Sequence, residues 1–224
     1  DHEEVLYMLA VSQRYLTKYS AALINLDRLK GLVVDHSRGH QETGHVFRAM
    51  NKADAALNAY SRATQINPAL LASFRAQIEI LSATGRGSLT GPLKQQLASL
   101  ESLPKVLVVV MDLIAHGKLV KAEQLCKEFM QKVPRHIEGM RLLADIGNRL
   151  GVLEDAEFLL ESALEFSPES TPVRIDYIQV LRKRQKHEEA LVQAKFLLEK
   201  DPKNPQFQSV FAIQSMQSGD YDTA

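Results

Sequence analysis

Small apolar residues recur at a nearly constant interval along the chain. Six alanines lie in matching contexts, separated by 34, 66, 34, 34 and 34 residues: Ala22, Ala56, Ala122, Ala156, Ala190 and Ala224. A proline follows four of them by twelve residues: Pro68, Pro134, Pro168 and Pro202. A glycine or asparagine precedes four of them by five residues: Asn51, Gly117, Gly151 and Gly219. Because glycine and proline interrupt helices, this punctuation predicts a repeated helix–turn–helix unit. The alanine lies in its second helix, where two backbones approach closely.

The interval divides the chain into seven units, which we expect to form one array over residues 1–224. Their bounds are 3–36, 37–70, 71–102, 103–136, 137–170, 171–204 and a truncated 205–224. The third unit is irregular, with a first helix over 72–84 and a second helix beginning at Pro92. Leu93, Leu97 and Leu100 lie on one face of that second helix. The predicted fold class is all-α, an α-solenoid of helix–turn–helix units.

Residues 106–115 form the longest apolar run, interrupted only by Asp112 and too short to cross a bilayer. This run predicts an unusually apolar first helix in the fourth unit. We favour its burial by the irregular third unit, because the two are adjacent in the chain. The alternative is exposure as a ligand or dimer surface.

The composition is that of a globular chain, with 45% apolar and 24% charged residues. Lys plus Arg and Asp plus Glu are both 27, so the net charge is zero. Such a chain is a poor candidate for non-specific nucleic-acid binding, and we expect neither a nucleic-acid nor a membrane partner. Cys126 is the only cysteine and cannot form an internal disulfide, which fits a reducing, cytoplasmic location.

No constellation of catalytic residues stands out, so we expect no enzyme activity, metal site or cofactor in these residues. His36, His40 and His45 are the densest histidine group, but their spacing does not place them on one helix face. We interpret them as turn and surface histidines. Residues 85–88 are faintly similar to a phosphate loop, but they follow a helix and lack a lysine, which favours an inter-helix turn. We expect Cys126 to be a buried, inert thiol.

A period of 34 with this punctuation resembles the tetratricopeptide repeat. The resemblance implies a right-handed superhelix in which the first helices line a concave groove. It also implies which unit positions point into that groove. The candidate binding residues at those positions are Tyr7, Arg14, His45, Arg48, Arg75, Arg141, Asp145, Asn148, Arg149, Gln179, Arg182 and Lys183.

These candidates are rich in arginine, whose planar fork can donate two parallel hydrogen bonds to a carboxylate. We expect the groove to bind an extended protein or peptide segment with acidic groups. Three of the arginines, at 141, 149 and 182, should be exposed. The alternative is ion pairing within the groove, for example Arg141 with Asp145 and Arg75 with Glu79. We expect the chain to be a monomer or a weak homodimer.

The second half resembles something more specific. Residues 140–163, 174–186 and 207–224 are similar to the N-terminal repeats of bacterial tetratricopeptide-containing sulfotransferases. This resemblance implies a substrate-recruiting arm whose catalytic domain lies beyond Ala224 and uses 3'-phosphoadenosine 5'-phosphosulfate. No residue of the 224 matches the phosphate-binding loop of that domain. The alternative is a free-standing tetratricopeptide adaptor or assembly factor with no attached enzyme.

Overall fold

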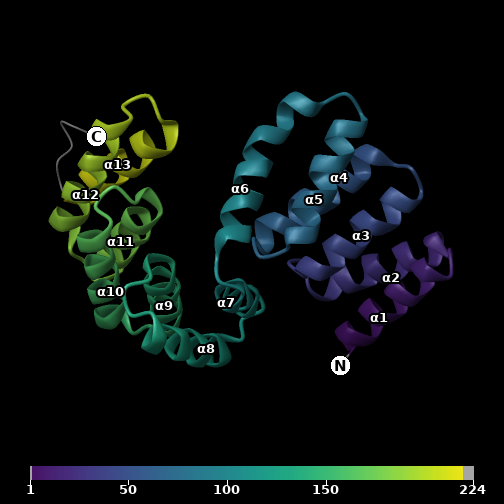
Figure 1. Ribbon diagram of the computed structural model, residues 1–224, viewed down its shortest axis with the longest axis horizontal. Helices are drawn as coiled ribbons and strands as arrows, with labels where there is room; N and C mark the ends of the chain where they lie inside the picture. Colours follow the sequence, from purple (N-terminus) through teal and green to yellow (C-terminus); the bar gives the residue numbers. More distant parts are fainter. Residues whose placement is uncertain (1, 219–224) are drawn as a thin grey trace. The chain divides into compact units, whose positions relative to one another are not determined.

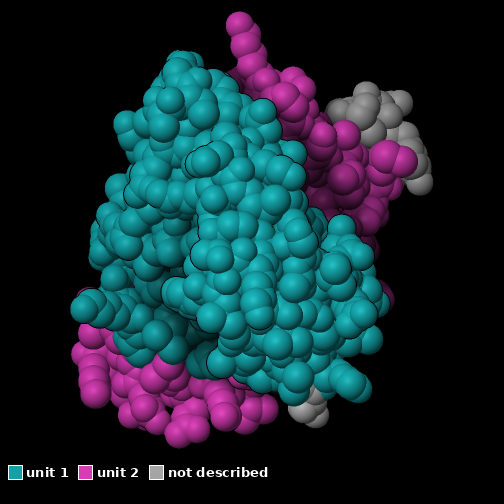
Figure 2. Space-filling view, turned by 90° about the vertical axis from the view of Figure 1, so that its right-hand side faces the viewer, with its two compact units in different colours: residues 1–116 teal, residues 117–224 magenta. Residues whose placement is uncertain are grey.

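The computed structural model of the protein describes residues 2–218. Over this range the chain consists of thirteen α-helices and one short 3-10 helix, with no strand (Figure 1). The predicted all-α class is therefore confirmed. The helices group into two compact units, residues 1–116 and residues 117–224, which Figure 2 colours separately.

The first unit is built from helical hairpins that stack in chain order. Its elements are α1 (His2–Tyr15), α2 (Tyr19–Leu32), α3 (Ser37–Ala49), α4 (Ala53–Ile66), α5 (Leu71–Ala83), η1 (Gly87–Thr90), α6 (Gly91–Ser102) and α7 (Lys105–Ala115). Helix α1 pairs with α2, α3 with α4, and α5 with α6. The second helix of one hairpin packs on the first helix of the next, as α2 does on α3 and α4 on α5.

The second unit repeats this arrangement. Its elements are α8 (Leu119–Lys132), α9 (Ile137–Leu150), α10 (Leu153–Phe166), α11 (Thr171–Lys183), α12 (His187–Lys200) and α13 (Pro205–Ser218). Helix α9 pairs with α10 and α11 with α12, while α8 packs on α9, α10 on α11 and α12 on α13. The core between these helices includes the fully buried Leu160, Leu181 and Leu197.

The recurring alanines lie in the second helices and have no exposed surface. This holds for Ala22, Ala56, Ala122, Ala156 and Ala190, whereas Ala224 lies outside the described residues. Close helix approach is visible at Gly147 of α9, where an added Cβ would stand 3.5 Å from the Cβ of Ala156. The expected role of the alanine is thus confirmed.

The turn inside each of the five hairpins contains one residue with a left-handed backbone, and so does the turn between α7 and α8. These residues are Thr17, Asn51, Gly85, Gly117, Gly151 and Gln185, with φ values between 58° and 83°. Asn51, Gly117 and Gly151 were predicted as turn residues, and Gly219 lies outside the described residues. Glycine and asparagine tolerate this conformation well, but threonine and glutamine do so only at a cost. The turn geometry is therefore more regular than the glycine pattern indicates.

The third hairpin follows the prediction closely. Helix α5 ends at Ala83, and the stretch resembling a phosphate loop is the turn that leads into η1, with Gly85 at φ 74°. Helix α6 begins at Gly91 with Pro92 in its first turn. Leu100 of α6 is buried.

Helix α7 has a buried side and a polar attachment. Leu107, Val110 and Ile114 are buried, so one face of the apolar run is covered. Asp112 on the same helix accepts hydrogen bonds from two residues of this unit. Asn67 lies in the turn before α5, and Arg38 lies at the beginning of α3. The boundary between the two compact units falls after residue 116, inside the predicted repeat 103–136. The division of the chain into seven repeats of one array stays a prediction.

Candidate functional site

In the first unit, ion pairs join the helices that carry the predicted groove residues. Arg14 of α1 binds Glu42 of α3, and Arg48 of α3 donates from Nη2 to Glu79 Oε2 of α5 at 2.7 Å. Arg75 of α5 donates to Glu101 of α6 at 2.6 Å. The expected pair of Arg75 with Glu79 is therefore wrong, because each finds a partner on another helix. All three arginines are neutralised within the protein.

His45 and Tyr7 are packing residues in this unit. His45 Nδ1 and the Tyr60 hydroxyl are joined by a 2.7 Å hydrogen bond, with the rings edge to face at 5.3 Å. Burial lowers the pKa of His45 and raises the pKa of Tyr60 to about 12. Both groups are therefore neutral near pH 7. The half-buried Tyr7 ring lies 5.7 Å from the ring of His36. Neither side chain offers a charge to a partner.

In the second unit, Arg141 lies between two carboxylates. It donates to Glu138 one turn earlier at 2.6 Å and to Asp176 of α11 at 2.8 Å. Burial acts to lower the pKa of Arg141, but the hydrogen bonds and charge of Glu138 and Asp176 raise it above its usual value. Only 22% of its side chain is exposed. Two expectations are thus wrong: Arg141 is not freely exposed, and its partner is not Asp145.

The carboxyl-terminal ends of α9 and α11 carry a different group of cations. Lys183 Nζ donates to Asn148 Oδ1 at 2.6 Å, which brings the two helix ends together. Arg149 pairs with Asp145 on its own helix at 3.0 Å, and half of its side chain stays exposed. The side chain of Arg182 is exposed and forms no ion pair or hydrogen bond with any described residue. We call Arg149, Arg182 and Lys183 the basic edge.

The remaining predicted residues meet beside the basic edge. Asp145 and Asn148 of α9 and Gln179 of α11 line a small crevice above Leu160 of α10. Its volume of about 10 Å³ has room for no more than one water molecule. The structure therefore places seven predicted residues on α9 and α11, and contacts within the protein occupy the side chains of five of them.

The histidines and the cysteine have structural positions. His36 and His136 cap α3 and α9, because each Nδ1 accepts a hydrogen bond from the backbone N–H of Gly39 or Gly139. Sequence reasoning missed these caps, although the spacing His-x-x-Gly at 36–39 and 136–139 could have indicated them. Burial raises the pKa of the Cys126 thiol to about 11, as expected of an inert thiol.

Within residues 2–218, no three histidine, cysteine or acidic side chains lie together as a metal site would require. Over the same residues, no helix has both the length and the apolar character needed to span a membrane.

Part of the chain matches a known repeat family. Residues 149–212 match the family model described as tetratricopeptide repeat. No curated protein matches the chain. These comparisons do not support the predicted resemblance to sulfotransferases.

Two solved structures are similar over nearly the whole chain. One is a thermophilic tetratricopeptide protein of Thermus thermophilus, at 17% identity over 96% of this chain and 99% of that chain, with a TM-score of 0.42. The other is a tetratricopeptide repeat protein of Parabacteroides merdae, at 14% identity over 95% of this chain and 84% of that chain, with a TM-score of 0.47.

Proposed function

We propose that this tetratricopeptide-repeat chain is a protein-interaction scaffold that binds an acidic, extended segment at the basic edge of its second unit. Stacked helical hairpins present long continuous surfaces, which suits them to extended partners. The first helices α9 and α11 offer such a surface, with cations at one end. The observation that carries the proposal is Arg182, an exposed guanidinium without an ionic partner among the described residues.

The other predicted arginines are poorer candidates, because intramolecular carboxylates already occupy them. Arg14, Arg48 and Arg75 each bind a glutamate, and Arg141 binds two carboxylates. A partner's carboxylate would have to displace these contacts. At Arg182, a partner's carboxylate would displace no intramolecular contact. At Arg149, it could bind the exposed half of the side chain without breaking the pair with Asp145.

The charges along α9 and α11 also give the segment a direction. Glu138 lies in the first turn of α9 and Asp176 in the middle of α11, whereas the basic edge lies at the carboxyl-terminal ends of the two helices. An acidic group of the partner would bind at the basic edge, with the less acidic part of the segment toward Arg141. The polar crevice lined by Gln179 lies between them.

The expected affinity is modest and depends on salt. Exposed ion pairs contribute only about 0.2–1 kcal/mol each. Three cations acting together still give measurable binding to a multivalent acidic peptide, provided that ionic strength is low. Cations at helix carboxyl termini also stabilise the helix dipole, and this intramolecular role is the competing explanation for the basic edge.

Fluorescence anisotropy with fluorescein-labelled hexaglutamate separates the two explanations. We expect wild-type binding at about 50 mM salt that weakens strongly at about 300 mM, where the screening length shortens. Reversing the three charges of the basic edge to glutamate should abolish binding. The matched control reverses three exposed lysines on second helices of the same unit: Lys121, Lys132 and Lys195. Equal loss of binding in both variants would contradict a specific site.

The attached-sulfotransferase hypothesis rests on the sequence resemblance of residues 140–224 alone. The free-standing adaptor is the simpler alternative, since it requires only the interaction surface. We expect no sulfonate transfer when the purified chain is incubated with 3'-phosphoadenosine 5'-phosphosulfate and candidate acceptors. Turnover by the chain itself would overturn both versions of the proposal.

A further inference from the structure

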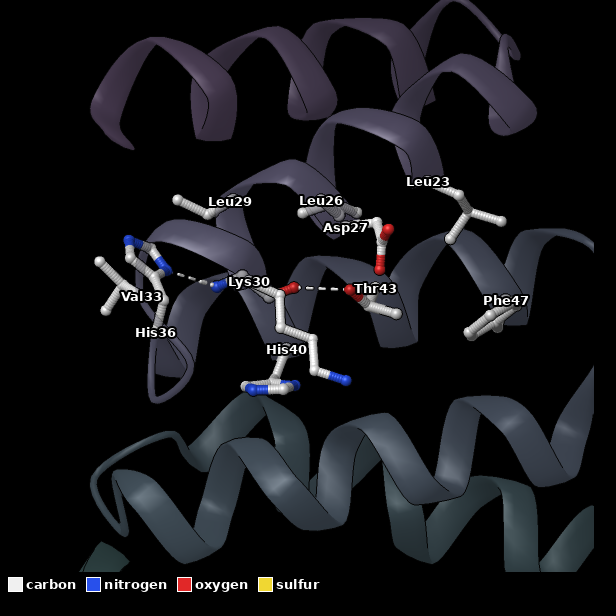
Figure 3. A pocket seen from close by; sticks show the side chains of 11 residues that line it. Leu23, Leu26, Asp27, Leu29, Lys30, Val33, His36, His40, Thr43 and Phe47 are labelled. Atoms are coloured by element: carbon white, nitrogen blue, oxygen red, sulfur yellow. Dashed lines mark hydrogen bonds between the residues drawn. The ribbon is translucent and has the colours of Figure 1, made fainter. Parts of the chain in front are cut away.

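A pocket of about 270 Å³ lies between α2 and α3 in the first unit (Figure 3). Leu23 and Leu26 of α2 and Phe47 of α3 give it apolar walls. Gly39 of α3 also lines it, and an added Cβ there would stand 3.0 Å from Leu29 Cδ2 and 3.1 Å from His36 Nδ1. The volume is slightly below the range of about 300–1,000 Å³ that is typical of small-molecule sites, so it suits a single side chain.

The histidine and threonine side chains that line the pocket already have hydrogen-bond partners within the protein. His36 Nδ1 accepts from the Gly39 N–H at 2.9 Å, and Thr43 Oγ1 donates to the Gly39 carbonyl at 2.8 Å. His40 Nε2 donates to the carbonyl of Val34 at 2.9 Å. With these bonds made, the interior offers few free polar atoms and favours an apolar occupant.

The equivalent junction in the second unit shows what fills this space. The same type of cap recurs 100 residues later, at the junction of α8 and α9. There His136 Nδ1 accepts a hydrogen bond from the backbone N–H of Gly139 at 3.2 Å. There the Met130 sulfur occupies the space that a Cβ on Gly139 would need, and Phe129 lies beside it. In the first unit, Lys30 stands at the position that corresponds to Met130. The heavy atoms nearest to an added Cβ on Gly39 belong to Leu29 and His36.

The α2–α3 and α8–α9 junctions also differ at two further positions. Met140 and Leu143 of α9 correspond to His40 and Thr43 of α3. Three aliphatic side chains of the second junction are therefore replaced by polar ones in the first.

We propose that the α2–α3 pocket binds one flexible aliphatic side chain, methionine or leucine, of a partner protein. The side chain would take the place that Met130 takes on Gly139. Asp27 and Lys30 line the same pocket, are exposed, and make no ion pair or hydrogen bond with a described residue. They can accept from the N–H and donate to the C=O of the peptide group that carries the side chain. This chemistry identifies a protein segment as the occupant.

Amide chemical shifts measured on the whole chain test this proposal with two probes. The first is N-acetyl-methioninamide, and the second is N-acetyl-glycinamide, which has the same peptide groups without the side chain. We expect saturable shifts at Gly39 and Thr43 with the methionine probe, with a dissociation constant on the order of millimolar, and none with the glycine probe.

Lys30→Met reproduces the second junction and should fill the pocket, weakening the methionine probe about tenfold or more. Arg28→Met is the matched control, because it removes the same charge two residues away outside the pocket and should leave the shifts unchanged. Absence of saturable shifts in the wild type, or equal shifts in Lys30→Met, would overturn the proposal. Hexaglutamate binding at the basic edge is measured in a separate experiment. Either proposal can therefore be contradicted while the other still holds.

Discussion

Asn67 of the α4–α5 turn donates a hydrogen bond from Nδ2 to Asp112 Oδ1 of α7 at 2.7 Å. The Asn67 side chain is fully buried, and its Oδ1 accepts from the backbone N–H of Ala69 at 3.0 Å. Arg38 reaches the same carboxylate at 3.2 Å. One amide therefore closes the turn and also anchors the apolar helix α7 to residues 45 positions earlier.

Asn67→Ala should destabilise the first unit by about 1–3 kcal/mol, because a buried hydrogen bond to a charged acceptor is lost. Chemical denaturation gives the free energy of unfolding, and hydrogen exchange in 105–115 reports on the attachment of α7. Asn58→Ala on the preceding helix is the control, since Asn58 makes no side-chain hydrogen bond with a described residue. Equal effects of the two substitutions would show that the anchor contributes nothing.

The left-handed turn residues predict opposite effects from reciprocal substitutions. Thr17 has φ 59°, a conformation that costs a β-branched residue roughly 1–2 kcal/mol, partly offset by the extra chain entropy of glycine. Thr17→Gly should therefore stabilise the protein by about 0.5–1 kcal/mol. Gly151 has φ 83° with open space around it, so Gly151→Ala should destabilise through backbone strain alone. Melting temperatures that move in the same direction would contradict this account.

Ala156→Leu should overpack the contact between α9 and α10 and cost about 1–3 kcal/mol. Ala156 is fully buried and faces Gly147 at close range, so no space exists for the larger side chain. Phe158→Leu on the same helix is the control, because Phe158 is mostly exposed. An unchanged melting curve for Ala156→Leu would mean that the alanine does not set the helix spacing.

The cap at His36 predicts that acid weakens the first unit. Burial, followed by the charge of His116, lowers the pKa of His36, while Glu3 and Glu4 act in the opposite direction. The facing Tyr7 hydroxyl stays neutral there, because burial raises its pKa. The unfolded chain, with a histidine pKa of about 6.5, binds the proton more readily than the folded chain. The free energy of unfolding should therefore fall as pH decreases through about 6.5 toward the folded pKa.

His36→Asn isolates this contribution, because asparagine caps a helix without titrating. The difference in free energy of unfolding between wild type and variant should shift in favour of the variant between about pH 7.5 and pH 5. The variant retains His45, whose pKa burial also lowers, so some pH dependence remains in both proteins. A difference that is independent of pH would exclude His36 as the titrating group.

The sequence predicted the fold best at positions where backbone or packing geometry permits only one or two residue types. An alanine at a close helix contact, a proline after a helix and a glycine in a left-handed turn are such positions. They predicted the hairpins, including the irregular one whose second helix ends at Ser102. Thr17 and Gln185 were not predicted as turn residues, because their left-handed backbone is not marked by the glycine or asparagine that favours it.

The candidate site was less predictable, because arginine reaches partners that are distant in the sequence. Arg141 binds Asp176, 35 residues later, in preference to Asp145 one turn away on its own helix. Arg75 likewise binds Glu101. A sequence shows which arginines a helix face carries, but the packing of neighbouring helices decides which of them remain available.

The most direct test of the proposed function is the map of amide shifts that hexaglutamate produces on the whole chain. We predict shifts confined to the carboxyl-terminal ends of α9 and α11, within residues 145–151 and 179–185, and their loss in Arg182→Glu. Shifts of similar size along the second helices α8, α10 and α12, unaffected by Arg182→Glu, would contradict the basic edge as the binding site.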